Sequence, residues 1–191
     1  NLFLLFITLP PFFIASASAS TTLLNLGAIV MTLGLLPIIA GSVNLLFTAS
    51  GNTSAIVKNP GALAATLAMV LLPLYAIGAF FTGMDVFLGT GQLGDMATTL
   101  DMGFLWTVGG LMILSGAYIS HPLACNKELS EPSKANLTVW FVLFGGFAST
   151  ITNLIGDFTM QAVANSGVED AVAQTEGFYL VGAALFYFTA I

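Results

Sequence analysis

The stretch LAATLAMVLLPLYAIGAFFTGMDVF, residues 63–87, indicates the class of fold. It is 25 residues long and carries one charged side chain, Asp85. As an α-helix it would rise about 37 Å at 1.5 Å per residue, which is more than the roughly 30 Å hydrocarbon core of a bilayer. Its apolar residues are continuous rather than alternating, so the stretch predicts a membrane-spanning helix and not a barrel strand.

The composition of the whole chain agrees with a membrane protein. Of its 191 residues, 57% are hydrophobic and 6% are charged, and the mean hydropathy is +0.98. A water-soluble domain needs more charge than this to solvate its surface, so we expect an integral membrane protein in contact with lipid. Three lysines, no arginine and a net charge of −6 exclude nucleic acid as a partner, because almost nothing would neutralise the phosphates.

Five further apolar runs accompany this stretch, and together they predict an all-α, polytopic membrane bundle of about six transmembrane helices. The six runs are residues 2–14, 23–47, 63–87, 98–120, 135–160 and 176–191. Turn-forming residues separate them, and the sequence shows no internal repeat and no room for a soluble domain. Residues 1–191 therefore form a single transmembrane domain. We expect the native chain to be longer at both ends, because this one starts without methionine and stops on an apolar segment.

Charged residues between the runs predict the orientation of the chain. Successive loops alternate between the two sides of the membrane, so the second and fourth loops share one face, and these hold Lys58, Lys127 and Lys134. Loops on the other face hold the acidic residues Asp95, Glu169 and Asp170. The positive-inside rule then places the lysine face in the cytoplasm.

The chain offers few ligands for a metal or a haem. Membrane redox proteins hold haem with paired histidines, and this sequence has one histidine, His121, and one cysteine, Cys125. We interpret His121 as an interfacial residue; the alternative is a single metal ligand shared with another subunit. Pro122 is expected to interrupt the helix between the two side chains, which disfavours a two-ligand pair. A lone cysteine forms no disulfide within the chain.

Three carboxylates lie within or beside the apolar runs: Asp101, Asp157 and Glu176. A carboxylate at membrane depth is costly unless it is paired, hydrated or protonated, so the three are candidates for a proton path. Asp101 is expected in the first turn of its helix, where free N–H groups and the helix dipole favour an anion, and the other two lie near helix ends. We therefore favour capping and interfacial hydration over proton conduction.

Small residues at a spacing of four predict close helix contacts. The pairs are Ala79 with Gly83 and Gly145 with Ser149. Because lipid is as apolar as leucine, helices in a membrane associate through such close packing. We expect these faces to form an interface with partner subunits.

A series of short landmarks carries a resemblance to a known family. Pro11, Phe12 and Phe13 end the first run, Gly27 opens the second, and then Pro37, Gly41, Asn44, Thr48, Gly51 and Pro60 follow in order. The later segments are LYAIGAFFTGMD (74–85), NKELSEPSKANLTVWFVLFGG (126–146) and TEGFYLVGAALFYFTAI (175–191). Their order resembles the C-terminal half of the catalytic subunit of haem-copper oxidases, in the branch of C-type oxidases and nitric oxide reductases. The resemblance implies a fold like that subunit.

The resemblance also implies that the family's metal and haem ligands are missing here. Phe12 and Phe13 stand where the family has two metal-binding histidines. The family's His-x-His segment corresponds to TTLDMGF, where the degenerate positions are Thr99, Leu100, Asp101, Met102 and Gly103. No catalytic, cofactor-binding or metal-binding residue can be carried over. We expect no cofactor on this chain.

Two hypotheses for the function follow. The first is a non-catalytic structural or accessory subunit, which packs against other membrane subunits of a respiratory or other electron-transfer complex. The second is a subunit of such a complex that conducts protons or binds a quinone or pigment. We favour the first because every ligand is lost while the scaffold remains, and we expect no catalysis by the chain alone. The resemblance implies a bacterial inner membrane or an equivalent energy-transducing membrane.

Overall fold

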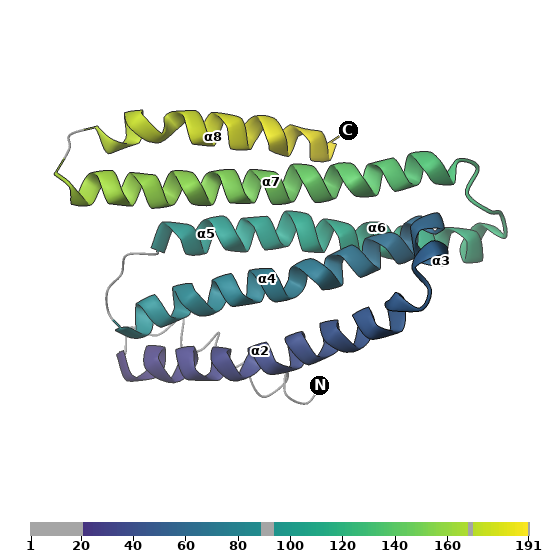
Figure 1. Cartoon of the computed structure of the whole chain (residues 1–191), viewed down its shortest axis with the longest axis horizontal. Coiled ribbons are helices and arrows are strands. Elements are labelled where there is room, and N and C mark those ends of the chain that lie inside the picture. Colours follow the sequence, from purple (N-terminus) through teal and green to yellow (C-terminus); the bar gives the residue numbers. More distant parts are fainter. Residues whose placement is uncertain (1–20, 89–93, 168–169, 191) are drawn as a thin grey trace.

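The computed structural model describes residues 21–88, 94–167 and 170–190, with side chains for 35–82, 96–167 and 170–189. These residues are helical and include no strand. Successive long helices run in opposite directions (Figure 1). The elements are α2 (Thr21–Ser50), α3 (Thr53–Lys58), α4 (Pro60–Leu88), α5 (Gly94–Gly103), η1 (Phe104–Gly109), α6 (Gly110–Cys125), α7 (Pro132–Asn165), α8 (Ala171–Tyr187) and η2 (Phe188–Ala190).

Three helical spans are long and apolar enough to cross a membrane: Pro60–Thr82, Met96–Cys125 and Pro132–Asn165. A shorter apolar helical segment covers Leu35–Ser50. The predicted all-helical fold is therefore confirmed, and the three spans found among the described residues agree with association with a membrane. Five of the six predicted runs are helical, whereas the run at residues 2–14, with Phe12 and Phe13, lies outside the described residues.

Local sequence sets the ends of these helices. Before α4, the side-chain oxygen of Asn59 accepts hydrogen bonds from the backbone N–H groups of Gly61 (3.0 Å) and Ala62 (3.1 Å). Pro60 then occupies the first helical position, where a missing N–H costs nothing. Helix α6 ends at Asn126, whose φ of 50° is left-handed and stops the helix.

Several predicted helix boundaries are wrong by four or five residues, and two of these errors change the interpretation of candidate residues. The helix predicted at 98–120 begins at Gly94, so Asp101 lies beyond the first turn and does not cap it. Helix α6 passes through Pro122 and continues to Cys125, so proline does not interrupt it before the cysteine. Proline is tolerated inside membrane helices because neighbouring groups satisfy the backbone that it frees.

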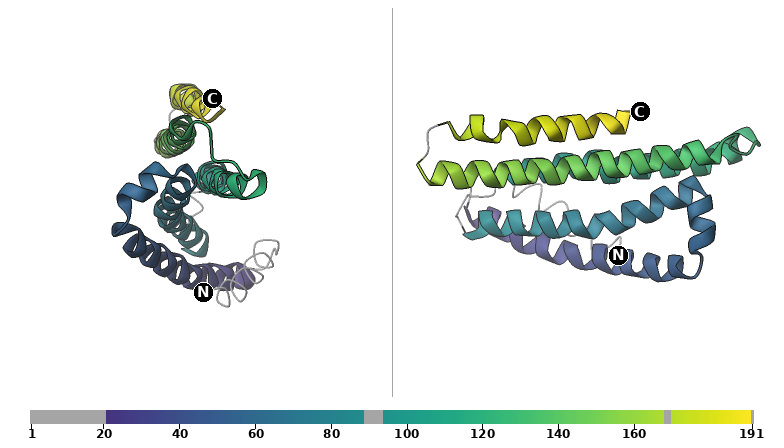
Figure 2. Two further views of the ribbon diagram at one scale, coloured as in Figure 1. Left: turned by 90° about the vertical axis from the view of Figure 1, so that its right-hand side faces the viewer. Right: turned by 45° about the horizontal axis from the view of Figure 1, so that its top comes forward.

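The long helices form an open arc rather than a closed bundle when viewed end on (Figure 2). Among the described elements, the backbone of α8 contacts only α7 and its own continuation η2. Helix α7 also contacts α4, α5, η1 and α6, so it lies between α8 and the rest of the protein. This arrangement leaves α5 and α8 on opposite sides of α7, without backbone contact between them.

The interior is divided along the length of the helices. An apolar cluster fills the half toward α3 and the α6–α7 loop, and its members are Leu63, Ala64, Ala68, Leu71, Tyr75, Val108, Leu111, Val139 and Val142. Buried polar side chains continue along α7 toward the other end, at Ser149, Thr150 and Asp157. The two ends of the helices therefore differ in the polarity of the interior.

The lysines lie at one end of the molecule, as the sequence predicts. Lys58 ends α3, Lys127 is in the α6–α7 loop and Lys134 is in the first turn of α7, all on the right in Figure 1. Asp95 at the start of α5 and Asp170 before α8 lie at the opposite end. Glu169 is outside the described residues.

Gly145 and Ser149 lie inside the chain and not on an outer face. Gly145 is buried under the end of α8: a Cβ there would lie 3.0 Å from the carbonyl oxygen of Leu185. Ser149 is also buried. The prediction that these two residues form an interface with a partner is therefore wrong, because the close approach that they allow is already taken by α8.

Candidate functional site

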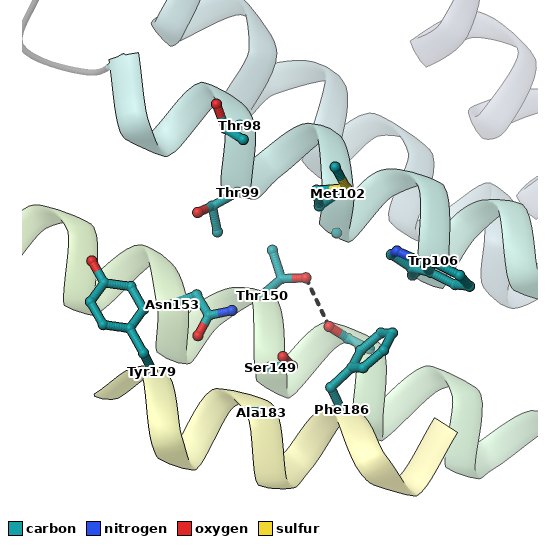
Figure 3. Close-up of a pocket in the computed structure, with 12 residues that line it drawn as sticks. Thr98, Thr99, Met102, Trp106, Ser149, Thr150, Asn153, Tyr179, Ala183 and Phe186 are labelled. Carbon is teal, nitrogen blue, oxygen red and sulfur yellow. Dashed lines mark hydrogen bonds between the residues drawn. The ribbon is translucent and has the colours of Figure 1, made fainter. Parts of the chain in front are cut away.

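A pocket of about 350 Å³ lies between α5 with η1, α7 and α8 (Figure 3). Helix α7 forms its floor, and α5 and α8 form its two walls. The backbones of these walls do not contact each other, but the rings of Trp106 and Phe186 meet across the gap. Its lining consists of Thr98, Thr99, Met102, Gly103, Trp106, Gly146, Ser149, Thr150, Asn153, Tyr179, Ala183 and Phe186.

A buried carboxylate supports the polar end of this pocket. The hydroxyl of Thr99 on α5 donates a hydrogen bond of 2.6 Å to one oxygen of Asp157, and the hydroxyl of Tyr179 on α8 donates one of 2.8 Å to the other. Asp157 is 5% exposed and belongs to α7. The carboxylate therefore joins three helices. Among the described residues, the ion pair within 4 Å is Lys134–Glu131, at the far end.

A second cluster of hydroxyls lies under the floor of the pocket. The hydroxyl of Tyr75 on α4 is 3.0 Å from that of Thr150 and 3.3 Å from that of Thr107. Thr150 itself donates a bond of 2.8 Å to the carbonyl oxygen of Gly146, which Figure 3 marks with a dashed line. Tyr75 thus ties α4 to α7 and η1, and Thr150 already donates its proton to Gly146.

Asn153 borders the pocket with an incompletely satisfied side chain. Its carboxamide oxygen is buried and has no hydrogen-bond partner. That oxygen lies against Gly182 on α8, where no Cβ would fit. The carboxamide nitrogen lies farther from Gly182 than the oxygen does, on the side toward the pocket (Figure 3). Asn153 therefore offers the pocket a hydrogen-bond donor.

The other end of the pocket is aromatic. The rings of Trp106 and Phe186 meet edge to face with centroids 5.6 Å apart, and Met102 lies one helical turn before Trp106. Trp106 belongs to η1, a segment of π-helix between α5 and α6. Such widened turns occur frequently at functional sites. The pocket thus has a hydroxyl-rich end and an aromatic end.

The positions that the resemblance assigns to lost haem ligands lie between two pockets. Thr99, Met102 and Gly103 line the pocket described above. Leu100 and Asp101 line a second pocket of about 200 Å³ between α2, α4 and α5. The sequence stretch that corresponds to the family's haem-binding segment therefore borders both of these pockets.

The structure places the three candidate proton-path residues in different surroundings. Asp101 lines the second pocket, Asp157 lies behind the first, and Glu176 is exposed on α8. Toward the lysine end, the apolar cluster with Val139 and Leu111 separates Asp157 from that surface. The structure brings Asp157 together with Thr99 and Tyr179 instead.

His121 and Cys125 are both exposed on α6. Within the part of the chain that the structure describes, no group of three or more His, Cys, Asp or Glu side chains is placed to hold a metal ion. These two residues therefore add no ligand to the pocket.

Thr150, Asn153 and Tyr179 were missed in the sequence, although a signal exists for the first two. Ser149, Thr150, Asn153 and Asp157 recur at intervals of three and four along an otherwise apolar helix, which places them on one face. Tyr179 gives no such signal, because its place depends on how α8 packs on α7.

Comparisons with protein-family models, curated proteins and solved structures find no match to this chain. The resemblance to haem-copper oxidases thus stays a prediction, and the function is argued from the geometry of the pocket.

Proposed function

We propose that this chain is a polytopic membrane subunit that binds a small amphipathic molecule between α5, α7 and α8. The observation that carries this proposal is the 350 Å³ pocket with a polar end, an aromatic end and a buried carboxylate beside it. Pockets for small molecules commonly begin at about this volume and combine apolar walls with a few placed polar groups.

The polar lining exceeds what helix packing requires. A structural link between the three helices needs only Asp157 and the two hydroxyls that it accepts. Thr98 and Asn153 add further polar groups around an open volume. Hydroxyl and carboxamide groups are costly at membrane depth when nothing bonds to them. A bound molecule with a polar headgroup would satisfy them.

The shape of the pocket suits a molecule that comes from the bilayer. The walls α5 and α8 run along the length of the protein, and their backbones do not contact each other (Figure 1). A ligand dissolved in lipid can enter there sideways, without passing through the water phase. Trp106 is 55% exposed, so the aromatic end of the pocket is accessible from outside the chain.

We further propose the setting of this subunit. A scaffold derived from the haem-copper oxidase subunit, with its ligands lost, would place the chain as a non-catalytic accessory subunit of a respiratory or other electron-transfer complex. The support is that the degenerate ligand stretch 99–103 lines the two pockets. The one-sided lysines support a cytoplasmic location for their end, in a bacterial inner or equivalent membrane.

A purely structural subunit is the second candidate. It is favoured by the close contacts of glycines with side chains on neighbouring helices: Gly103 against Thr150 and Gly146 against Thr107. In this reading, Asp157 serves only to link α5, α7 and α8. The two candidates differ in whether the pocket is occupied in the cell.

Two neighbouring alanines on α8 allow a matched test. Ala183 lines the pocket, whereas Ala184 is exposed and does not. The wild type, Ala183→Phe and Ala184→Phe are purified in mild detergent, and their solvent extracts are quantified by mass spectrometry. We expect one small molecule per chain in the wild type and in Ala184→Phe, and its loss in Ala183→Phe, where the new ring fills the pocket. Equal extracts from all three proteins would favour the structural candidate.

A further inference from the structure

We infer that the pocket selects a neutral aromatic molecule with a phenolic hydroxyl, such as an alkylated phenol or hydroquinone. This inference rests on the proposed function and names the class of ligand. The inference follows from the hydrogen-bond acceptors and donors that the lining residues direct into the pocket.

The lining favours an uncharged ligand. None of the twelve lining residues is a lysine, arginine, histidine, aspartate or glutamate. An anionic headgroup would find no cation there and would approach Asp157, which lies behind the wall. A cationic headgroup would need direct contact with that carboxylate, but Asp157 is 5% exposed and is not among the lining residues.

Thr99 requires a hydrogen-bond donor on the ligand. A threonine hydroxyl has one proton and two lone pairs, and here the proton is directed to Asp157 over 2.6 Å. The hydroxyl oxygen therefore presents a lone pair to the pocket and no proton. Asp157 acts as a positioning residue, because it fixes the direction of this proton without touching the ligand.

Asn153 supplies the complementary group. Its carboxamide nitrogen points toward the pocket and can donate to an oxygen of the ligand (Figure 3). A hydroxyl is the simplest group that donates to Thr99 and accepts from Asn153 through the same oxygen. A carbonyl alone would satisfy Asn153 and leave Thr99 without a donor.

The apolar end favours an aromatic ring next to this hydroxyl. Trp106, Phe186 and Met102 lie there, and their rings and sulfur make favourable edge and face contacts with another ring. A tail attached to the ring would leave between α5 and α8 into lipid. A phenol with an alkyl chain combines all three features.

The two tryptophans of the chain provide the assay. Trp106 lines the pocket and Trp140 stacks on Phe144 elsewhere on α7, so Trp140→Phe leaves Trp106 as the single reporter. The probes are 4-bromo-3-heptylphenol and its methyl ether, because bromine quenches indole fluorescence at contact range. We expect saturable quenching by the phenol. The ether should bind about tenfold more weakly, since it leaves the oxygen of Thr99 without a donor.

Variants of the polar end test the cause of this preference. Thr99→Val should remove the tenfold preference while ether binding stays the same, which also shows that the pocket is still formed. Thr152→Val is the matched control, because Thr152 donates to the carbonyl oxygen of Ala148 and lies outside the lining. This variant should keep the preference. Asp157→Asn should reduce it, because the new amide can donate to Thr99 and release the threonine proton toward the pocket.

The outcomes separate this inference from the proposed function. If neither probe quenches Trp106 saturably, no amphipathic ligand site is present and both proposals fail. If phenol and ether bind equally well, the pocket stands and the inference about its ligand class fails. An unchanged preference in Thr99→Val or in Asp157→Asn would overturn the role assigned to that residue.

Discussion

Removing the hydroxyl of Thr99 should destabilise the contact between α5 and α7 in a way that depends on Asp157. The two side chains form the 2.6 Å hydrogen bond that links these helices, and the carboxylate is 5% exposed. Hydrogen bonds to charged groups contribute about 1.5–3 kcal/mol in soluble proteins, but side-chain bonds between membrane helices average about 0.6 and reach about 1.7 kcal/mol. We therefore expect Thr99→Val to lower the free energy of unfolding by about 1 kcal/mol.

A double-mutant cycle isolates this bond. Thr99→Val, Asp157→Leu and the double variant are unfolded from mixed micelles by titration with sodium dodecyl sulfate, and helix content is followed by circular dichroism. The coupling free energy between the two positions should be about 1 kcal/mol. Thr152→Val should change stability little, because its hydroxyl bonds only within α7. A coupling energy near zero would refute the claim that Asp157 holds the threonine proton.

Three further predictions concern packing, orientation and cofactors. Gly146→Val should destabilise the protein by about 1–3 kcal/mol, because the new side chain would overlap Thr107. Gly116→Val is the control and should not destabilise it, because the space around Gly116 is open. The stabilities of the two variants are compared by thermal unfolding. Cysteines placed at Lys58 and at Asp95 in a Cys125→Ser background should be labelled by impermeant maleimide from opposite sides of the membrane. The isolated chain should show no stoichiometric Soret band; a band lost in His121→Ala would contradict this.

The helices were predictable because each depends mainly on its own residues. A continuous run such as 63–87 needs only length and apolarity to be recognised, and α4 covers it. The ends were less predictable. Helix α5 starts at Gly94, within a stretch whose glycines and aspartate are typical of a loop. The predicted interruption at Pro122 was wrong for a related reason. Whether a proline ends a helix depends on the groups packed around it, and the sequence does not show where these groups lie.

The site was predictable only in part. Thr150, Asn153 and Asp157 are three and four residues apart, which places them on one face of α7. A search for polar residues at the helical period would have found this face. The partners on α5 and α8 could not be inferred, because they depend on the angle at which those helices cross α7. Gly182 illustrates this point: because it has no side chain, Asn153 packs against it, although the two residues are 29 positions apart in the sequence.

The most direct test of the central claim is the mass of the intact protein. Native mass spectrometry of the chain, taken from its own membranes in mild detergent, measures directly whether a small molecule is bound. The account predicts one constant added mass per chain in the wild type and in Ala184→Phe, and the bare chain in Ala183→Phe. A bare chain in all three proteins, or the same adduct on Ala183→Phe, would contradict it.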